Sequence, residues 1–202
     1  MRPAFGVLAL QGDFTAHFLA LRDVGASVQE VRRVADLSGL SGLVLPGGES
    51  TALLRLMEDE PWFETLHRFH QAGGILFGTC AGAILLAREV RPAQRSLGLL
   101  DAVVVRNAYG RQVDSFETRV DAPALGGRLS AVFIRAPRFD RLGAEVEVLA
   151  SHGDEPVMVQ QGTVLATTFH PELTHSRAVQ TYLVRLAESV GLRQALARGE
   201  VA

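Results

Sequence analysis

The sequence contains no lysine. All 20 basic residues are arginines, and 22 acidic residues leave a formal net charge of −2. Without lysine, the chain cannot form the Schiff base of a usual pyridoxal-phosphate enzyme or of a lysine-type aldolase. It also cannot contain the Gly-Lys-Ser/Thr end of a phosphate-binding P-loop. A near-neutral chain with a pI of about 6.3 lacks the electrostatic footprint for binding nucleic acid or anionic lipid.

Cysteine occurs once, as Cys80. A single thiol excludes a disulfide framework within the chain and a multi-cysteine zinc or iron–sulfur site. Two interpretations of this residue stay open: a buried, inert thiol, or a catalytic nucleophile that is served by a histidine elsewhere in the sequence. We expect neither a metal nor another cofactor.

Long hydrophobic runs are also missing. No stretch approaches the roughly 18 consecutive apolar residues of a membrane span, and residues 1–4 lack the pattern of a signal peptide. We therefore expect a cytoplasmic protein. The 202 residues, 48% of them hydrophobic and 21% charged, have the composition of an ordinary globular protein. Since neither a repeat nor a linker interrupts them, we expect residues 1–202 to form a single domain.

Short apolar runs alternate with helix-like stretches in the first half of the chain. Strands are predicted at 5–10, 27–31, 43–45 and 75–77, and helices at 14–24, from about 50, from 61, and from about 80 to 87. This order predicts an α/β fold with a doubly wound, mainly parallel sheet flanked by helices. Further strands are predicted at 101–106, 115–120, 130–135, 145–150, 157–160 and 164–169, followed by a helix at 174–190. The short links between these strands indicate antiparallel additions to the sheet or its extension.

The segment Gly-Thr-Cys-Ala-Gly at 78–82 lies between a predicted buried strand and a helix. This is the pattern of a nucleophile elbow with Cys80 in place of serine, because small residues on both sides permit a tight, strained turn. The turn places the thiol at a helix N-terminus, where the helix dipole favours the thiolate. The backbone N–H of Ala81 is then a ready oxyanion donor.

A cysteine nucleophile needs a base, and histidine is the usual one. Of six histidines, His170 follows the apolar run 164–169, so we expect it at the carboxyl edge of the sheet, where catalytic groups collect. Glu172, two residues later, is placed to orient the imidazole, which gives a Cys–His–Glu order along the chain. The other five are expected at local or surface positions: His17, His67 and His70 on solvated helix faces, His152 in a turn, and His175 in the first turn of the last helix.

A strand at 43–45 ends in Pro-Gly-Gly-Glu-Ser at 46–50. Because glycine has no Cβ, Gly47 and Gly48 allow backbone N–H groups to approach a ligand closely. Gly48 could thus supply a second oxyanion donor. A plain strand-to-helix turn is the alternative interpretation of this segment.

Three segments together resemble the class I (triad) glutamine amidotransferase family: Pro-Gly-Gly-Glu-Ser at 46–50, Phe-Gly-Thr-Cys-Ala-Gly at 77–82, and Phe-His-Pro-Glu at 169–172. Other segments narrow the resemblance to the PdxT-type glutaminase subunits of pyridoxal 5′-phosphate synthase, at 10–12, 97–101, 106–112, 115–117 and 132–137. The resemblance covers residues 5–182, nearly the whole chain. It implies a flavodoxin-like sheet.

The resemblance also implies a role for each matching residue. Cys80 would attack the side-chain amide of L-glutamine, His170 would move the protons, and Glu172 would orient His170. The residues that would contact glutamine are Gly47, Gly48, Glu49, Arg106, Ile134 and Arg135, and those that would form the oxyanion hole are Gly48 and Ala81. A guanidinium group suits the planar carboxylate of an amino acid.

The family further implies a partner. Ammonia would pass to a separate synthase subunit, a (β/α)₈ barrel of the PdxS type, within a large hetero-oligomer. The missing lysine agrees with this, since the Schiff-base chemistry would belong to the partner. We expect low glutaminase activity in isolation, with docking completing the oxyanion hole near Gly47 and Gly48, and with Gln11 reporting docking to that loop.

Two alternative functions stay open from the sequence. The first is another cysteine hydrolase on the same sheet, such as an intracellular peptidase or a DJ-1-like protein, because fold alone does not decide function. The second is a non-catalytic regulatory or scaffold subunit with a degenerate site. The intact set of Cys80, His170 and Glu172 argues against the second alternative.

Overall fold

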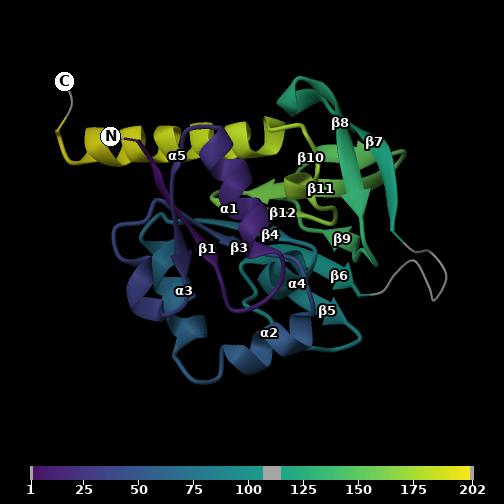
Figure 1. Ribbon diagram of the computed structural model, residues 1–202, viewed down its shortest axis with the longest axis horizontal. Helices are drawn as coiled ribbons and strands as arrows, with labels where there is room; N and C mark the ends of the chain where they lie inside the picture. Colours follow the sequence, from purple (N-terminus) through teal and green to yellow (C-terminus); the bar gives the residue numbers. More distant parts are fainter. Residues whose placement is uncertain (1, 107–114, 201–202) are drawn as a thin grey trace.

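The computed structural model describes residues 2–106 and 115–200. Within them, nine strands form one sheet of order β2-β1-β3-β4-β12-β11-β10-β7-β8 (Figure 1). The strands are β1 (Ala4–Leu8), β2 (Ser27–Val31), β3 (Gly42–Leu45), β4 (Ile75–Thr79), β7 (Phe116–Ala122), β8 (Gly127–Phe133), β10 (Glu147–His152), β11 (Glu155–Gln161) and β12 (Val164–Thr167).

The sheet has a parallel half and an antiparallel half. Strands β2, β1, β3, β4 and β12 pair in parallel, and β11, β10, β7 and β8 continue the sheet through antiparallel pairs. The predicted α/β fold, with a mainly parallel sheet and antiparallel additions, is therefore confirmed. The second half of the chain extends the sheet that the first half begins.

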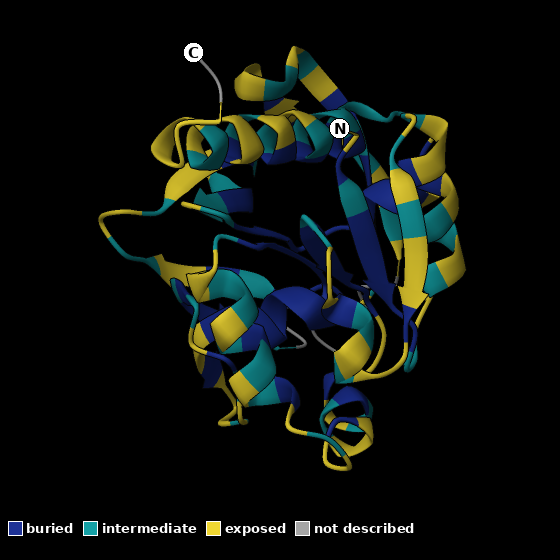
Figure 2. Ribbon diagram, turned by 90° about the vertical axis from the view of Figure 1, so that its left-hand side faces the viewer, coloured by how far each residue is buried: buried dark blue, intermediate teal, exposed yellow. Residues whose placement is uncertain are grey.

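Helices and a small second sheet cover the two faces of the parallel half. One hydrophobic core lies beneath α1 (Phe14–Asp23) and α5 (Ala178–Ala197). The other lies against α2 (Ser50–Leu56), α3 (Trp62–Gln71), α4 (Ala81–Leu86) and the three-stranded sheet of β5 (Ala87–Arg91), β6 (Leu100–Val105) and β9 (Arg138–Leu142). Figure 2 shows buried central strands between helices whose outer sides are exposed.

Strand β4 illustrates how the sequence fills both cores. Ile75 and Phe77 belong to the core under α1 and α5, and Leu76 belongs to the opposite core. Side chains alternate between the two faces of a strand, so a strand buried on both faces reads as a continuous apolar run. This explains why the parallel strands were predictable from short apolar segments.

The structure differs from the sequence prediction at the last helix. Helix α5 begins at Ala178 rather than at 174, because Pro171–Leu173 forms a separate 3₁₀ turn, η3, and Thr174 is extended. The Thr174 hydroxyl donates a hydrogen bond back to the Pro171 carbonyl, which holds this turn. His175 therefore precedes the helix instead of lying in its first turn. The helix also continues to Ala197, beyond the predicted end at 190.

Two strands were not predicted. The helix at the elbow ends at Leu86, and the next residue, Ala87, has the extended backbone that begins β5. Strand β9 follows the Ala-Pro pair at 136–137.

Among the described residues, no helix combines the length and the apolar character that crossing a bilayer requires.

Candidate active site

The elbow between β4 and α4 holds Cys80 in a strained conformation. Its φ is +48°, a value that residues other than glycine rarely adopt. A Cβ added to Gly78 would collide with the backbone of Gly82, and one added to Gly82 would collide with the carbonyl oxygen of Leu45 on β3. Both glycines are thus required by close backbone packing, which is the physical reason for the Gly-x-Cys-x-Gly pattern.

The environment of Cys80 is enclosed and polar on one side. Its side chain is buried, and its sulfur lies 4.0 Å from the carbonyl oxygen of Ile134. Its backbone N–H donates to the carbonyl of Thr167 at the end of β12, at 2.8 Å. The elbow is therefore tied to the neighbouring strand that leads to His170.

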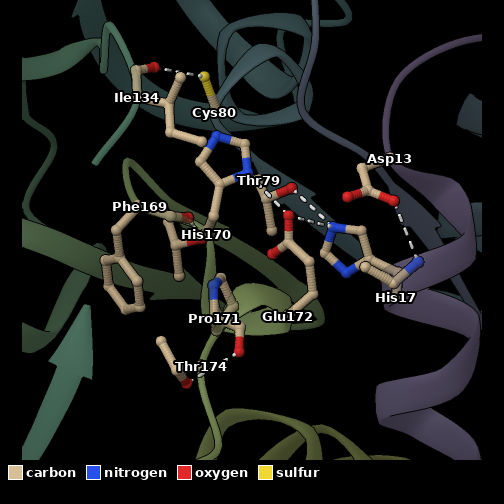
Figure 3. A network of polar contacts seen from close by, with 12 residues as sticks. Asp13, His17, Thr79, Cys80, Ile134, Phe169, His170, Pro171, Glu172 and Thr174 are labelled. Atoms are coloured by element: carbon tan, nitrogen blue, oxygen red, sulfur yellow. Dashed lines mark hydrogen bonds and ion pairs between the residues drawn. The ribbon is translucent and has the colours of Figure 1, made fainter. Parts of the chain in front are cut away.

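His170 lies three residues beyond the end of β12, at the carboxyl edge of the sheet. Its backbone N–H donates to Val132 at 2.8 Å, and its Nδ1 lies 2.7 Å from Oε1 of Glu172. Figure 3 shows the imidazole between the Cys80 sulfur and the Glu172 carboxylate. Pro171 begins the η3 turn, which brings Glu172 back against the ring of His170.

The charges of this group stabilise one another. Burial lowers the pKa of His170, but its hydrogen bonds to Cys80 and Glu172 and their charges outweigh burial and raise it to about 10. Burial raises the pKa of Glu172, but His17 first and then His170 outweigh it and lower that pKa to about 2. At neutral pH the arrangement favours an imidazolium on His170 beside the sulfur of Cys80.

His17 was wrongly expected on a solvated face. It is 2% exposed, and its Nε2 lies 3.0 Å from the Thr79 hydroxyl and 3.3 Å from Oε1 of Glu172. The sequence did contain a signal for this position. His17 lies three residues after Phe14 and four before Leu21, so it shares their apolar helix face.

A cavity of about 340 Å³ opens beside Cys80 and His170. Its lining comprises Asp13, Gly47, Gly48, Glu49, Ser50, Cys80, Ile84, Arg106, Ile134, Arg135, His170 and Leu173. All six residues that were expected to contact a substrate are therefore brought together, although they come from distant segments. Asp13, Ser50, Ile84 and Leu173 were not singled out from the sequence. Glu172 lies behind His170, away from this lining.

Two opposite charges face each other at the cavity. Arg106 Nη2 lies 3.2 Å from Oε1 of Glu49, and the other carboxylate oxygen accepts from the Ala52 N–H at 2.8 Å and from the Thr51 hydroxyl. The hydrogen bond from Thr51 is the main cause that lowers the pKa of Glu49. Burial acts in the opposite direction, and Ala52 and Arg106 lower the pKa further. Residues 107–112 of the motif that begins at Arg106 lie outside the described residues.

The diglycine loop packs against His170 on one side and against the loop after β1 on the other. A Cβ on Gly47 would collide with the His170 imidazole, and one on Gly48, whose φ is +135°, would meet the Gln11 amide. The Gln11 side chain accepts a hydrogen bond from the Glu49 N–H at 3.3 Å. Gly12, with a φ of +86°, lies directly against the Gly47 carbonyl.

No group of three or more His, Cys, Asp or Glu side chains in the described ranges is arranged to hold a metal ion.

The pattern that defines the SNO glutamine amidotransferase family matches residues 7–189. The chain belongs to this family. Membership favours the amidotransferase prediction over the peptidase and DJ-1-like alternatives.

Individual relatives agree with this membership. Pyridoxal 5′-phosphate synthase subunit PdxT of Deinococcus radiodurans is 53% identical over 188 residues, which cover 90% of this chain and 96% of that protein. The PdxT subunit of one Thermus thermophilus strain is 53% identical over 190 residues, covering 93% and 99%. A crystal structure of a glutamine amidotransferase superimposes with a TM-score of 0.86 at 50% identity, covering 91% of this chain and 98% of that one.

Proposed function

We propose that Cys80, His170 and Glu172 form a catalytic triad that hydrolyses L-glutamine to L-glutamate and ammonia. The observation that carries this proposal is the order of the three groups beside one cavity. The thiol is held on a strained elbow, the imidazole lies beside it, and a buried carboxylate 2.7 Å from Nδ1 orients the imidazole. These are the roles of nucleophile, base and orienting group.

The reaction proceeds in two halves. The Cys80 thiolate attacks the side-chain amide carbon, and the carbonyl oxygen becomes an oxyanion. His170 gives its proton to the departing nitrogen, the C–N bond breaks, and ammonia leaves a thioester. His170 then takes a proton from a water molecule, whose oxygen attacks the thioester, and the imidazolium returns that proton to the sulfur as glutamate leaves.

Glu49 and the arginines at the cavity fit the zwitterionic end of glutamine. We propose that Arg106 and Arg135 bind the α-carboxylate, since guanidinium groups suit a planar carboxylate. Glu49, whose pKa is lowered by the Thr51 hydroxyl in the first place, stays ionised and receives the α-ammonium. Ile134, Gly47 and Gly48 complete the contacts with the substrate.

Two backbone N–H groups are proposed as the oxyanion hole. Ala81 is the first residue of α4, so its N–H has no acceptor within the helix. The N–H of Gly48 would be the second donor. Its loop packs directly against His170, with no side chain between the Gly47 backbone and the imidazole.

The ammonia supports pyridoxal 5′-phosphate formation on a second protein in this proposal. The relatives named PdxT are subunits of pyridoxal 5′-phosphate synthase. We propose that this chain docks onto a PdxS-type (β/α)₈ subunit in a large hetero-oligomer and acts as a single cytoplasmic domain. Gln11 already contacts the Gly48–Glu49 loop, so a partner that touches Gln11 can reshape the oxyanion hole.

Ammonia release from glutamine tests the proposal. The chain is measured alone and mixed with a PdxS-type synthase subunit, with Cys80→Ala as the control. We expect low turnover alone, higher turnover in the mixture, and none with Cys80→Ala. Equal turnover with and without the partner would contradict the docking proposal. Full turnover by Cys80→Ala would contradict the triad.

A further inference from the structure

His17 connects three elements at the back of the site. It comes from α1, while its two polar partners come from β4 and η3: Thr79 immediately precedes Cys80, and Glu172 is the carboxylate behind His170. Figure 3 shows its ring aimed at both partners. The ring of Phe77 packs edge-on against the imidazole, with the two ring centroids 6.4 Å apart and the ring planes at 87°.

The contacts decide where the protons lie. An ionised Glu172 only accepts hydrogen bonds, so both nitrogen atoms near its Oε1 must carry hydrogen. These atoms are Nδ1 of His170 at 2.7 Å and Nε2 of His17 at 3.3 Å. If Nε2 were bare, its lone pair would face the carboxylate and repel it. The Nε2–H of His17 is consequently shared between Glu172 and the Thr79 oxygen.

We propose that His17 is a positioning residue that holds the Glu172 carboxylate in the orientation in which it receives the Nδ1–H of His170. This inference rests on the proposed triad. The second carboxylate oxygen, Oε2, is buried and has no hydrogen-bond partner among the described residues. The two histidines therefore make the polar contacts seen for this carboxylate, and without His17 a single bond would fix it.

The consequence of losing His17 is kinetic. A buried carboxylate with one bond can rotate or take up a proton, and either change moves the His170 ring relative to the sulfur. A misplacement of about 1 Å at a reacting group can cost on the order of 100-fold in rate. Glutamine binding involves other residues, so its KM should change little.

Two amide variants separate a donor at Nε2 from mere space filling. In His17→Gln the amide nitrogen reaches the position of Nε2, whereas in His17→Asn it is one carbon shorter and cannot. Both are measured for ammonia release in the complete complex with the synthase subunit. We expect His17→Gln to stay within about threefold of the unmodified chain, and His17→Asn to lose on the order of 10- to 100-fold in kcat with KM within about twofold.

A matched control uses His70 on α3, a partly buried histidine that is hydrogen-bonded to the Thr163 hydroxyl at 3.2 Å and does not line the cavity. His70→Asn should leave kcat and KM unchanged. Thermal unfolding of each variant shows whether it is folded. Equal losses of kcat in His17→Gln and His17→Asn would overturn the inference, because a donor at the position of Nε2 would then make no difference to the rate.

A double-mutant cycle tests whether His17 acts through Glu172. On a Glu172→Gln background, His17→Asn should lower kcat by less than about threefold, because the group that it positions is gone. Additive losses would overturn the inference. If Cys80→Ala keeps full turnover, the proposed triad itself fails. If Cys80→Ala is inactive while His17→Asn is fully active, only the inference about His17 fails.

The pH profile gives a readout that simple packing would not move. The titratable groups facing His17 are Glu172 and, behind it, His170, while its β4 contacts Thr79 and Phe77 are uncharged. On its own helix, Asp13 accepts from the Ala16 N–H. Removing His17 takes away a contact that favours ionised Glu172. The acid limb of kcat/KM in His17→Asn should therefore move to higher pH by about one unit or more. An unmoved limb would overturn the inference.

Discussion

At the residue scale, Glu172 is the point on which the polar chemistry converges. Its ordinary pKa is 4.5, and in the fold burial acts to raise that value while His17 and His170 lower it to about 2. A carboxylate with a depressed pKa stabilises the folded state above its unfolded pKa and loses that contribution as pH falls through the folded value. The difference between the ordinary and the folded pKa of Glu172 corresponds to about 3 kcal/mol in the free energy of unfolding.

We therefore predict acid sensitivity that depends on this one residue. The free energy of unfolding, measured by denaturant titration, should decrease between about pH 4.5 and pH 2. The raised pKa of His170 predicts a second loss as pH rises from about 6.5 towards 10, since that group stabilises the fold while it stays protonated. Glu172→Gln should flatten the acid limb and weaken the alkaline limb, which also depends on the contact between His170 and Cys80. An unchanged profile in that variant would contradict the assignment.

The reach of sequence reasoning also differs residue by residue. The place of Cys80 in the candidate site could be predicted because five consecutive residues form its glycine-flanked turn. The place of Glu172 could be predicted because it follows His170 by two residues. The role of His17 depends on partners from two distant elements, and no local pattern encodes such a meeting. Its spacing from Phe14 and Leu21 was a signal of burial that the expected solvated face overlooked, and nothing local indicates the carboxylate beside it.

At the element scale, the elbow works because a helix and two strands approach one another without side chains between them. Gly82→Ala would push a methyl group into the Leu45 carbonyl. We predict a loss of about 1–3 kcal/mol or more in the free energy of unfolding, measured by denaturant titration. Gly191→Ala is the control, because nothing lies near that position on α5. It should stabilise the chain by about 0.5–1 kcal/mol, and equal effects of the two substitutions would contradict the packing argument.

The elements themselves were predictable to different degrees. Strands β1, β3, β4 and β12 of the parallel half are largely apolar runs, which can be recognised without knowing their partners. The start of α5 was misplaced because residues 174–177 contain no proline or glycine that would mark a boundary, whereas Thr174 closes the η3 turn with its hydroxyl. Strand β5 was missed because it begins at the residue directly after α4, without an intervening loop.

At the scale of the whole molecule, the site lies where the carboxyl ends of β4 and β12 meet, between the two hydrophobic cores. Ligand binding at such a position should stabilise the entire fold. We predict that L-glutamine raises the melting temperature of Cys80→Ala, which binds without turnover. At 100 times Kd, the gain is about 2.7 kcal/mol, or roughly 5–10 °C for a domain of this size.

Arg106→Ala in the Cys80→Ala background is the control for this measurement. Arg106 pairs with Glu49 at the cavity, so its loss should remove most of the glutamine-dependent shift while leaving the melting temperature without glutamine little changed. A shift of equal size in both variants would contradict the assigned orientation of the substrate. D-Glutamine carries the same charged groups with the opposite configuration at its α-carbon, so it should give a smaller shift in the melting temperature.

The lone thiol in the elbow has one more consequence, for exposure to peroxide. Thiolates oxidise to sulfenic acid far more readily than thiols do, and a neighbouring cysteine commonly captures that product as a disulfide before it is oxidised further. Cys80 has no second cysteine within the chain to do so. Recovery of Cys80 after oxidation to a sulfenic acid must therefore come from an external thiol, and until one arrives the sulfur is open to irreversible oxidation.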